Sequence, residues 1–504
     1  MELLWNEFGV KRLIYSGIEQ TQVDESISLP EEMRTGAMYD TAIEVLDYSA
    51  DVTVDNCRAE SGKINVDGRI RIRAVLLDER EKPYAFNAEV HFENSSVAEG
   101  VDSGMEADVQ TSIKSLSLRG AGGSQLAMSA LVELEFNVSS SGPLKVLSGI
   151  SGIADLEIKT VSVAAGRRVE LANETVRLSE EIASDGADDV LIYNALVSIR
   201  DTNIENGKAC INGIVTLNAL CRNDDGELIQ LVRNIPFRES IEMNGGAEEI
   251  FTSAQIENLS VRALGTEFSL ISFEADVRFR VYGMRRGRME IPVDAFSPSM
   301  NFNCLIQKVS VLNSEGGSCI QHSVRENLTV PDGMPDIFTA LNASVCPIVT
   351  SVGFANGEMQ AEGLLSTRFI YRSSQNKLYS FVEEVPFSFT MAIPSGADKV
   401  KLALNVQPNV TGGGGRTAQV SYSIDASAEF MSVASFSAVA GIAEVDADIG
   451  DETKPKGIII YNACDGETTF DVARRFGIPS SKIASLNKEL GDTYKDGDKL
   501  ILIV

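Results

Sequence analysis

The side chains that could serve in catalysis are few and far apart in this chain. The sequence has only two histidines, His91 and His322. A serine nucleophile needs a base such as histidine beside it, and neither histidine lies near a Gly-x-Ser-x-Gly turn. Pairs of carboxylates that could act as acid and base are uninformative, because 72 residues are acidic and such pairs abound. The pattern argues against a hydrolase.

The glycine-rich segments also lack the features of a phosphate-binding loop. In such a loop a Ser or Thr follows the lysine and binds magnesium, whereas isoleucine follows Lys63 and alanine follows Lys208. Residues 412–415 are glycines between two strand patterns, with no following helix, so a hairpin turn is expected there. We therefore predict that the protein is not an enzyme and uses no cofactor.

The cysteines do not form a metal-binding or disulfide pattern. Their number is odd and no Cys-x-x-Cys pair occurs, which predicts reduced thiols and no metal site. The seven cysteines are Cys57, Cys210, Cys221, Cys304, Cys319, Cys346 and Cys464.

One basic cluster occurs in an otherwise acidic body, and it consists of Arg285, Arg286 and Arg288. Guanidinium groups bind carboxylates and phosphates through paired hydrogen bonds. The cluster is therefore a candidate anion or partner patch, with a neighbouring acidic repeat as the first partner to test. The alternative is a solvated turn without a ligand.

The elements that must position any site are repeated along the chain. Residues 63–76, 208–221 and 358–371 alternate apolar and polar residues, which is typical of a half-buried strand. A glycine interrupts the buried face at the same step each time, at Gly68, Gly213 and Gly363. Such a glycine predicts a bulge or the close approach of another backbone.

A phenylalanine follows each of these glycines after 24 residues, at Phe92, Phe237 and Phe387. Proline precedes two of them and His91 precedes the first, so His91 is better explained as a strand residue than as a catalyst. The glycines are 145 and 150 residues apart, far more than the roughly 20 to 50 residues of a solenoid repeat. The sequence therefore predicts three homologous domains in tandem.

Strands and turns dominate these repeats, so we expect a mainly β, sandwich-like fold. Apolar residues at helical spacing predict a short helix in each domain, over residues 37–46 in the first and 336–345 in the third. The predicted limits are 1–150, 151–302 and 303–450 for the repeats, 451–457 for a polar linker, and 458–504 for a small α+β module.

The last module has a βααβ pattern. A strand of isoleucines opens it and an apolar strand ends it. Thr468 with Asp471 three positions later predicts a capping box at the start of the first helix, and Gly477 ends that helix. Ser480 or Ser481 is expected to cap the second helix.

This module resembles the LysM domain over nearly its whole length. Residues 465–468 stand where that family has its Gly-Asp-Thr turn, residues 470–476 match its first helix, and Asn487 closes the second. Glu467 departs from the family, which usually has aspartate there. The resemblance implies a shallow ligand groove formed by Asp465, Gly466, Glu467, Thr468, Thr469, Asn487 and Leu490.

The net charge of −28 lies in the repeats, because residues 456–504 contain seven Lys or Arg and seven Asp or Glu. Such an acidic body repels nucleic acid and anionic lipid and favours a basic protein partner, unless the acidity serves solubility alone. The chain shows no apolar run of membrane-spanning length, and its first residues lack a signal-peptide pattern. We therefore expect a cytoplasmic protein that binds no nucleic acid.

With this tail, the whole chain resembles clostridial spore-coat assembly proteins that join SPOCS domains to a C-terminal LysM domain. The SPOCS part of the resemblance lies in the Leu-Pro-Glu at 29–31, the glycine strands and the Pro-Phe step. It implies a scaffold that docks coat morphogenetic proteins at the forespore surface in the mother cell, with the stage IV sporulation ATPase as partner. The alternative is a peptidoglycan-binding protein that uses the LysM groove on GlcNAc-containing glycan. The missing export signal favours a protein ligand.

Overall fold

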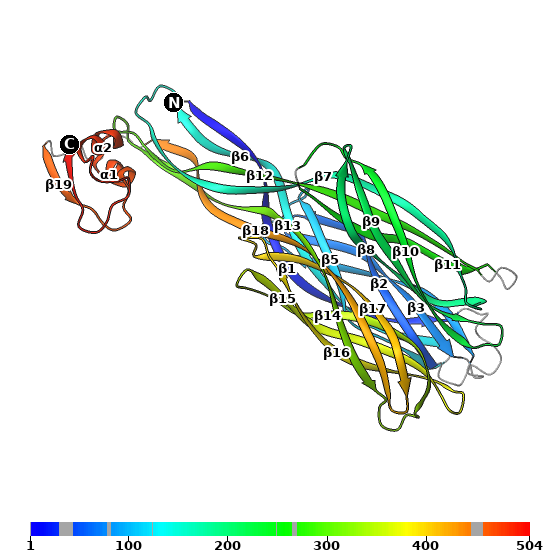
Figure 1. The fold of residues 1–504 in the computed structure, drawn as a ribbon. Helices are drawn as coiled ribbons and strands as arrows, with labels where there is room; N and C mark the ends of the chain where they lie inside the picture. Colours follow the sequence, from blue (N-terminus) through cyan, green and yellow to red (C-terminus); the bar gives the residue numbers. More distant parts are fainter. Residues whose placement is uncertain are drawn as a thin grey trace.

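The computed structural model describes residues 2–29, 44–77, 82–122, 124–247, 249–264, 270–444 and 457–504. The chain is mainly β, as predicted, and its β-rich repeats are followed by a small α+β module. Figure 1 shows the repeats side by side, with the module at one end of the molecule.

Among the described residues, each repeat contains six strands. The first has β1 (Leu3–Ser28), β2 (Glu44–Glu60), β3 (Lys63–Leu77), β4 (Pro83–Val97), β5 (Glu106–Gly122) and β6 (Gln125–Ile150). The second has β7 (Glu157–Ala183), β8 (Asp189–Glu205), β9 (Lys208–Arg222), β10 (Leu228–Glu242), β11 (Ile250–Ala263) and β12 (Leu270–Phe296). The third has β13 (Phe302–Thr329), β14 (Ile337–Ala355), β15 (Glu358–Ser373), β16 (Leu378–Ala392), β17 (Lys399–Gly414) and β18 (Thr417–Glu444).

The six strands of a repeat form two antiparallel sheets. The second, third and fourth strands make one sheet, and the first, fifth and sixth make the other. The first and third repeats share a six-stranded sheet, because β1 and β13 pair at Arg12 and Val311. Each repeat encloses its own hydrophobic core, so each is a β-sandwich. The predicted limits of the three repeats, 1–150, 151–302 and 303–450, remain proposals.

The repeated glycines lie directly opposite the repeated phenylalanines. Gly68 pairs with Phe92, Gly213 with Phe237 and Gly363 with Phe387. On its other side each glycine faces a bulge in the second strand of the repeat. A Cβ at any of the three would lie at most 2.8 Å from a carbonyl oxygen of that strand and 2.6 Å from the phenylalanine ring. The predicted bulge and close backbone approach are confirmed, and the ring covers the place where the glycine has no side chain.

The helices predicted in the repeats are wrong wherever the structure describes them. Residues 337–345 belong to β14 and residues 44–46 begin β2, whereas residues 37–43 lie outside the described residues. β14 has register shifts after Ile337 and after Ala340. Each shift adds a residue that interrupts the alternation of the strand. Two interruptions in succession space the apolar residues as a helix would.

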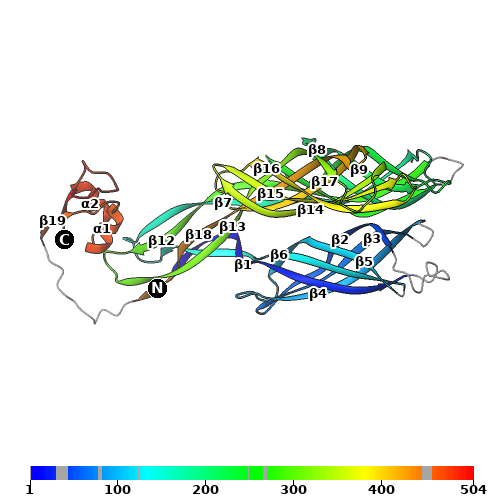
Figure 2. The ribbon, with the colours of Figure 1, turned by 90° about the horizontal axis from the view of Figure 1, so that it is seen from below.

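Six long strands continue beyond the sandwiches as two-stranded ribbons. The first halves of β1, β7 and β13 pair with the last halves of β6, β12 and β18, one ribbon per repeat. Figures 1 and 2 show the ribbons running from the sandwiches toward the C-terminal module. They pack on one another through a shared cluster that includes Val146, Ile291 and Val309. The three repeats are thus joined into one unit, which we call the frame.

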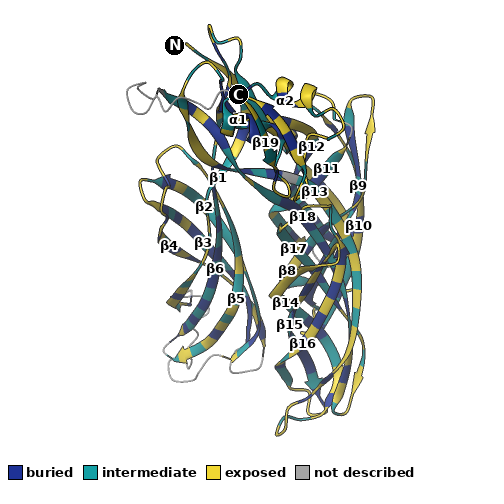
Figure 3. Cartoon of the chain, turned by 90° about the vertical axis from the view of Figure 1, so that its left-hand side faces the viewer, coloured by how far each residue is buried: buried dark blue, intermediate teal, exposed yellow. Residues whose placement is uncertain are grey.

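A second shared cluster joins the three-stranded sheets of the repeats. It contains Leu46, Leu191 and Leu341, the bulge residues near the start of β2, β8 and β14. Figure 3 shows buried residues alternating with less buried ones along central strands of the sandwiches such as β6. The frame is therefore held together at the ribbons and again between the sandwiches.

The C-terminal module has the predicted βααβ order: β19 (Ile458–Asn462), α1 (Thr469–Phe476), α2 (Ser480–Leu486) and β20 (Lys499–Ile503). Thr468 and Asp471 form the capping box of α1, and Gly477 ends it with φ 63°. The predicted serine cap of α2 is wrong, because Pro479 is the N-cap residue and no side chain of the helix caps it. Most of the predicted linker, up to residue 456, lies outside the described residues.

All seven cysteines are free. Within the described part of the chain, no helix combines the length and apolarity needed to cross a membrane. The same residues contain no cluster of three or more His, Cys, Asp or Glu that could hold a metal ion.

Candidate docking site

The C-terminal module is docked on the ribbon of the second repeat. Phe470 of α1 meets Phe296 at the end of β12 edge-on, with ring centroids 5.1 Å apart. Phe296 is 6% exposed and belongs to the hydrophobic core of the module. Lys159 of β7 pairs with Asp471 at 2.8 Å. Apolar packing and an ion pair therefore act together at one end of α1.

Two further contacts complete this docking. Arg474 of α1 pairs with Asp294 of β12. Glu157 of β7 accepts hydrogen bonds from the Ser480 backbone N–H, at 2.7 Å, and from the Ser480 hydroxyl. Ser480 opens α2, so the carboxylate of the ribbon supplies the cap that the helix itself lacks.

These docking residues are particular to the second ribbon. Each ribbon has a register shift near its outer end, and this shift identifies the equivalent positions of the three ribbons. The second ribbon has Lys159 opposite Asp294, where the first has Leu4 opposite Gly149 and the third has Leu305 opposite Gly441. Leucine and glycine cannot form the two ion pairs of the docked module. Only the second repeat therefore offers this contact.

The turn predicted to line the LysM groove uses its backbone donors internally. The N–H groups of Gly466, Glu467 and Thr469 donate to Tyr494, Cys464 and Asp492 carbonyls at 3.0, 3.2 and 2.9 Å. The Thr468 N–H donates to the Asp471 carboxylate at 3.0 Å. Asp465 is exposed. Four consecutive amides are thus unavailable to a ligand unless the turn rearranges.

The side chains of the predicted groove are also engaged. Glu467 accepts from the Tyr461 hydroxyl at 2.9 Å and pairs with Arg475. The Thr469 hydroxyl bonds to Tyr494 at 2.7 Å and is buried. The Asn487 amide bonds the backbone of Ile501 in both directions, at 3.0 and 2.8 Å, and so closes the free edge of β20. Leu490 packs on the module core. These residues build the module more than they present a ligand site.

The outer face of the two-stranded sheet is apolar and open, and we call it the isoleucine face. It consists of Ile458, Ile460, Ile501 and Ile503, which are 74%, 67%, 45% and 37% exposed. They form two directly opposed cross-strand pairs. Figures 1 and 2 show β19 at the outer end of the molecule, with α1 toward the ribbon. Docking of the helices therefore leaves the isoleucine face pointing away from the frame.

Exposed apolar side chains gather at this end of the molecule. The described residues include 19 large apolar side chains that are exposed, and ten of them lie on the ribbon ends or on the module. The ten are Leu4, Trp5, Val161, Leu305, Ile306, Ile458, Ile460, Leu486, Ile501 and Ile503. The four isoleucines among them adjoin one another across the two strands, and exposed apolar surface of this kind marks interaction sites. This end is the candidate docking site.

The arginine patch does not form a turn. Arg285, Arg286 and Arg288 lie within β12, where the ribbon of the second repeat is exposed. Arg286 pairs with Glu249 at 3.2 Å. Because side chains alternate along a strand, Arg286 and Arg288 share one face and Arg285 lies on the other. The three guanidinium groups therefore do not converge on a single anion.

Sequence reasoning missed the isoleucine face and the four docking residues Glu157, Lys159, Asp294 and Phe296. The isoleucine face could have been predicted from the run of isoleucines in β19. A strand that is apolar on both faces must expose one face to solvent when its sheet has only two strands and one covered side. The docking residues carried no such signal, since their partners lie about 180 residues or more away in the chain.

Comparison with known families places two segments of the frame. Residues 42–119 and 186–264 match the family model described as SipL, SPOCS domain. The first segment contains β2 to β4 and β5 as far as residue 119, and the second contains β8 to β11. The SPOCS resemblance is therefore confirmed for the first two repeats. No curated protein and no solved structure matches the chain.

Proposed function

We propose that this chain is a non-enzymatic adaptor of spore-coat assembly that acts in the mother cell at the forespore surface. The SPOCS match of the first two repeats carries the proposal, because it supports a sporulation-related adaptor role. The repeats would serve as the frame, and the LysM-like module would dock a coat morphogenetic protein. The stage IV sporulation ATPase is the first partner to test.

A presenting role suits the way the module is attached. Four side chains of one ribbon bind its helices, so the module is held in a defined orientation and not merely tethered. An adaptor benefits from such an arrangement, since a preoriented surface loses less freedom on binding. The frame supports docking by keeping the isoleucine face directed outward.

A protein ligand is favoured over glycan by the state of the groove. Recognition of an N-acetyl sugar needs free donors and acceptors at fixed places. The amides and most polar side chains of the predicted groove bond within the module. The isoleucine face, in contrast, offers apolar surface of the kind that protein interfaces bury at their centre. Peptidoglycan binding remains the alternative that the experiment must separate.

The experiment compares two lysine substitutions in the full-length protein. Ile460→Lys places a charge in the isoleucine face, and Ile18→Lys places one at an equally open isoleucine on β1, which is 63% exposed. Binding to the purified stage IV sporulation ATPase is measured by biolayer interferometry. We expect Ile460→Lys to weaken binding by tenfold or more, which corresponds to about 1.4 kcal/mol, and Ile18→Lys to leave it unchanged.

The glycan alternative is tested in parallel by cosedimentation with purified peptidoglycan. Asp465→Ala is the suitable groove variant, because Thr468 and Asn487 have structural hydrogen bonds and their replacement would disturb the module. Peptidoglycan binding that is lost in Asp465→Ala and kept in Ile460→Lys, with no binding to the ATPase, would establish the glycan function and reject the proposal.

A further inference from the structure

Equivalent side chains of the three repeats can be compared where the repeats meet. In the ladder between the second and third strands, Ser49 pairs with Arg73, Asn194 with Asn218 and Ser344 with Arg368. Arg73, Asn218 and Arg368 thus occupy one equivalent position, five residues after the repeated glycine. The residues next to the paired serines and asparagine are Tyr48, Tyr193 and Ala343.

At this equivalent position, two of the three contacts from one repeat to the next are arginine–tyrosine pairs. Arg368 of the third repeat stacks on Tyr48 of the first, with its guanidinium carbon 4.1 Å from the ring centroid. Arg73 of the first repeat lies 5.7 Å from the ring of Tyr193 in the second. Both are cation–π contacts. If the second and third repeats met in the same way, Asn218 of the second repeat would contact Ala343 of the third. Asn218 is shorter than the arginine of the other two contacts, and Ala343 is shorter than their tyrosine.

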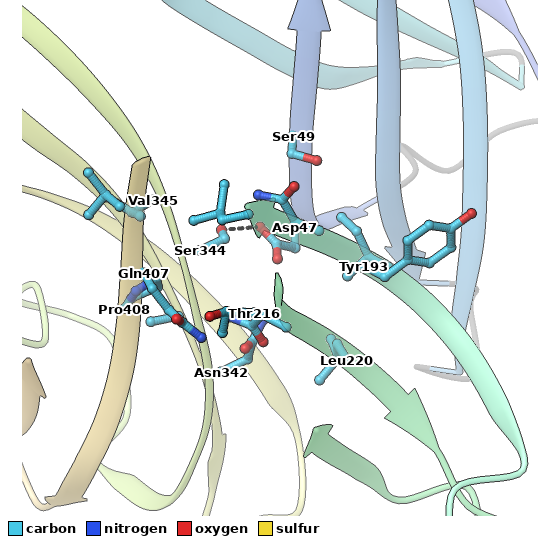
Figure 4. Close-up of a pocket in the computed structure, with 16 residues that line it drawn as sticks. Asp47, Ser49, Tyr193, Thr216, Leu220, Asn342, Ser344, Val345, Gln407 and Pro408 are labelled. Carbon is cyan, nitrogen blue, oxygen red and sulfur yellow. Dashed lines mark hydrogen bonds between the residues drawn. The ribbon is translucent and has the colours of Figure 1, made fainter. Parts of the chain in front are cut away.

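A cavity of about 70 Å³ lies where the three repeats meet, and its lining includes both Asn218 and Ala343. One water needs roughly 10–15 Å³ of such space, so the cavity holds several waters or one group of guanidinium size. Figure 4 shows Asp47 in the middle of the lining residues, with one carboxylate oxygen toward Ser344 and Asn342 below it. The cavity therefore borders both positions, 218 and 343, at which the arginine–tyrosine pair of the other two contacts is missing.

The residues that line the cavity include several with buried oxygens that lack a partner. Four side-chain oxygens of these residues, each almost wholly buried, have no hydrogen-bond partner among the described residues: the acceptors Asp47 Oδ2, Asn218 Oδ1 and Asn342 Oδ1 and the hydroxyl Ser49 Oγ. Asp47 is 0% exposed and Asn342 is 4% exposed. A buried acceptor without a partner is costly. The missing component is a donor, which arginine supplies at the other two contacts.

The two oxygens of Asp47 have different surroundings. Oδ1 accepts from the Tyr48 N–H at 2.9 Å and from the Ser344 hydroxyl at 2.8 Å, and Arg368 Nε lies 3.8 Å from it. Oδ2 has no such partner. Burial raises the pKa of Asp47 to about 6, so the carboxylate is mostly charged at neutral pH. A cationic donor in the cavity would therefore meet both a counter-charge and unpaired acceptors.

We propose that this cavity binds a guanidinium group, in the place where the other two contacts have an arginine. Asp47 supplies the counter-charge, and the oxygens of Ser49, Asn218 and Asn342 accept the N–H groups. The guanidinium comes either from a free small molecule or from an arginine side chain of a partner. The site does not depend on the adaptor function proposed above.

The test measures thermal unfolding of the full-length protein in guanidinium chloride up to about 20 mM, against sodium chloride at the same ionic strength. We expect guanidinium to raise the melting temperature in a saturable way and sodium to have no such effect. Asn218→Arg places a guanidinium in the cavity from within, so it should abolish the response. Asn212→Arg, on the same face of β9 and outside the cavity lining, is the matched control and should keep it.

A second variant covers the case in which Asn218→Arg fails to fold. Asp47→Asn keeps the shape and removes the counter-charge, so half-saturation should require about tenfold more guanidinium. Equal responses to guanidinium and sodium, or a response unchanged in both cavity variants, would show that water alone fills the space and would overturn the proposal. Tighter binding of N-acetyl-arginine amide than of guanidinium identifies a side chain as the source, and equal binding identifies a free cation.

Discussion

Replacing Gly363 by alanine tests the packing unit that all three repeats share. A Cβ at this position would lie 2.2 Å from the Ile348 carbonyl oxygen and 2.6 Å from Phe387 Cζ. Carbon atoms in ordinary contact with such neighbours lie at 3.4 Å or more. The ring could rotate away, but the carbonyl belongs to the bulged strand β14 and can move only with its backbone. The added Cβ would therefore clash with backbone that can move only at a substantial cost in free energy.

The expected cost follows from two opposing effects. Overpacking a core by one methyl group costs about 1–3 kcal/mol, and a backbone clash belongs at the upper end of that range. Replacing glycine by alanine also removes freedom from the unfolded chain, which returns about 0.4–1 kcal/mol. We predict that Gly363→Ala destabilises the third repeat by about 2 kcal/mol. Gly213→Val in the second repeat should cost more, because valine adds two further carbons.

Gly353→Ala is the matched control, because Gly353 lies in the same sheet and nothing lies within 4 Å of its Cβ. It should be neutral or stabilising. Since a chain of several domains need not unfold in one step, the assay is hydrogen exchange by mass spectrometry on peptides from β15 and β16 of the full-length protein. Exchange in Gly363→Ala as slow as in the wild type, or faster exchange in both variants alike, would refute the reasoning.

Three further predictions concern charge and chemistry. Burial raises the pKa of Asp47 to about 6, so the folded state binds this proton more tightly than the unfolded state does. The contribution of Asp47 to stability therefore falls as the pH rises from about 4 to 6, and it stays low at higher pH. The unfolding free energy of Asp47→Asn, minus that of the wild type, should accordingly increase by up to about 3 kcal/mol between pH 4 and 7.5 in urea titrations, and a flat difference would contradict the assignment. Lys159→Glu should release the C-terminal module from the ribbon, which would be measured as faster hydrogen exchange in α1. Lys145→Glu, on the ribbon of the first repeat, is the control and should leave this exchange unchanged. Equal exchange in the two variants would show that the ion pair with Asp471 does not hold the module. Finally, the purified protein should show no saturable ATP binding and no glycan cleavage, and either activity, lost on a point substitution in the repeats, would contradict the non-enzymatic role.

The glycine–phenylalanine unit was predictable because it occurs three times in the sequence with the same spacing. The glycines, Gly68, Gly213 and Gly363, predicted a close approach of another backbone. Pairing of each glycine with its phenylalanine explains why the two are always 24 residues apart. The helix expected at residues 336–345 failed for a local reason, since bulges in β14 interrupt the alternation on which strand prediction rests. In the tail the capping box at Thr468 was predictable from two residues alone.

The candidate site depended on contacts that no local pattern encodes. The LysM resemblance named the residues of a groove, but whether their amides are free depends on the chain at residues 492–494, which bonds to them. The cap of α2 comes from Glu157, more than 300 residues away, so a search for a nearby serine could not find it. The cavity at Asn218 and Ala343 becomes visible only when the three repeats are compared at their mutual contacts.

The central claim is that the isoleucine face, held outward by the frame, docks a coat morphogenetic protein. The most direct measurement is affinity capture of the full-length protein from sporulating cells, followed by mass spectrometry, with the wild type, Ile460→Lys and Ile18→Lys compared at equal expression. The account predicts that the stage IV sporulation ATPase is recovered with the wild type and with Ile18→Lys and is lost with Ile460→Lys. Recovery of the ATPase with Ile460→Lys at the wild-type level, or its absence from the wild-type capture, would contradict the account.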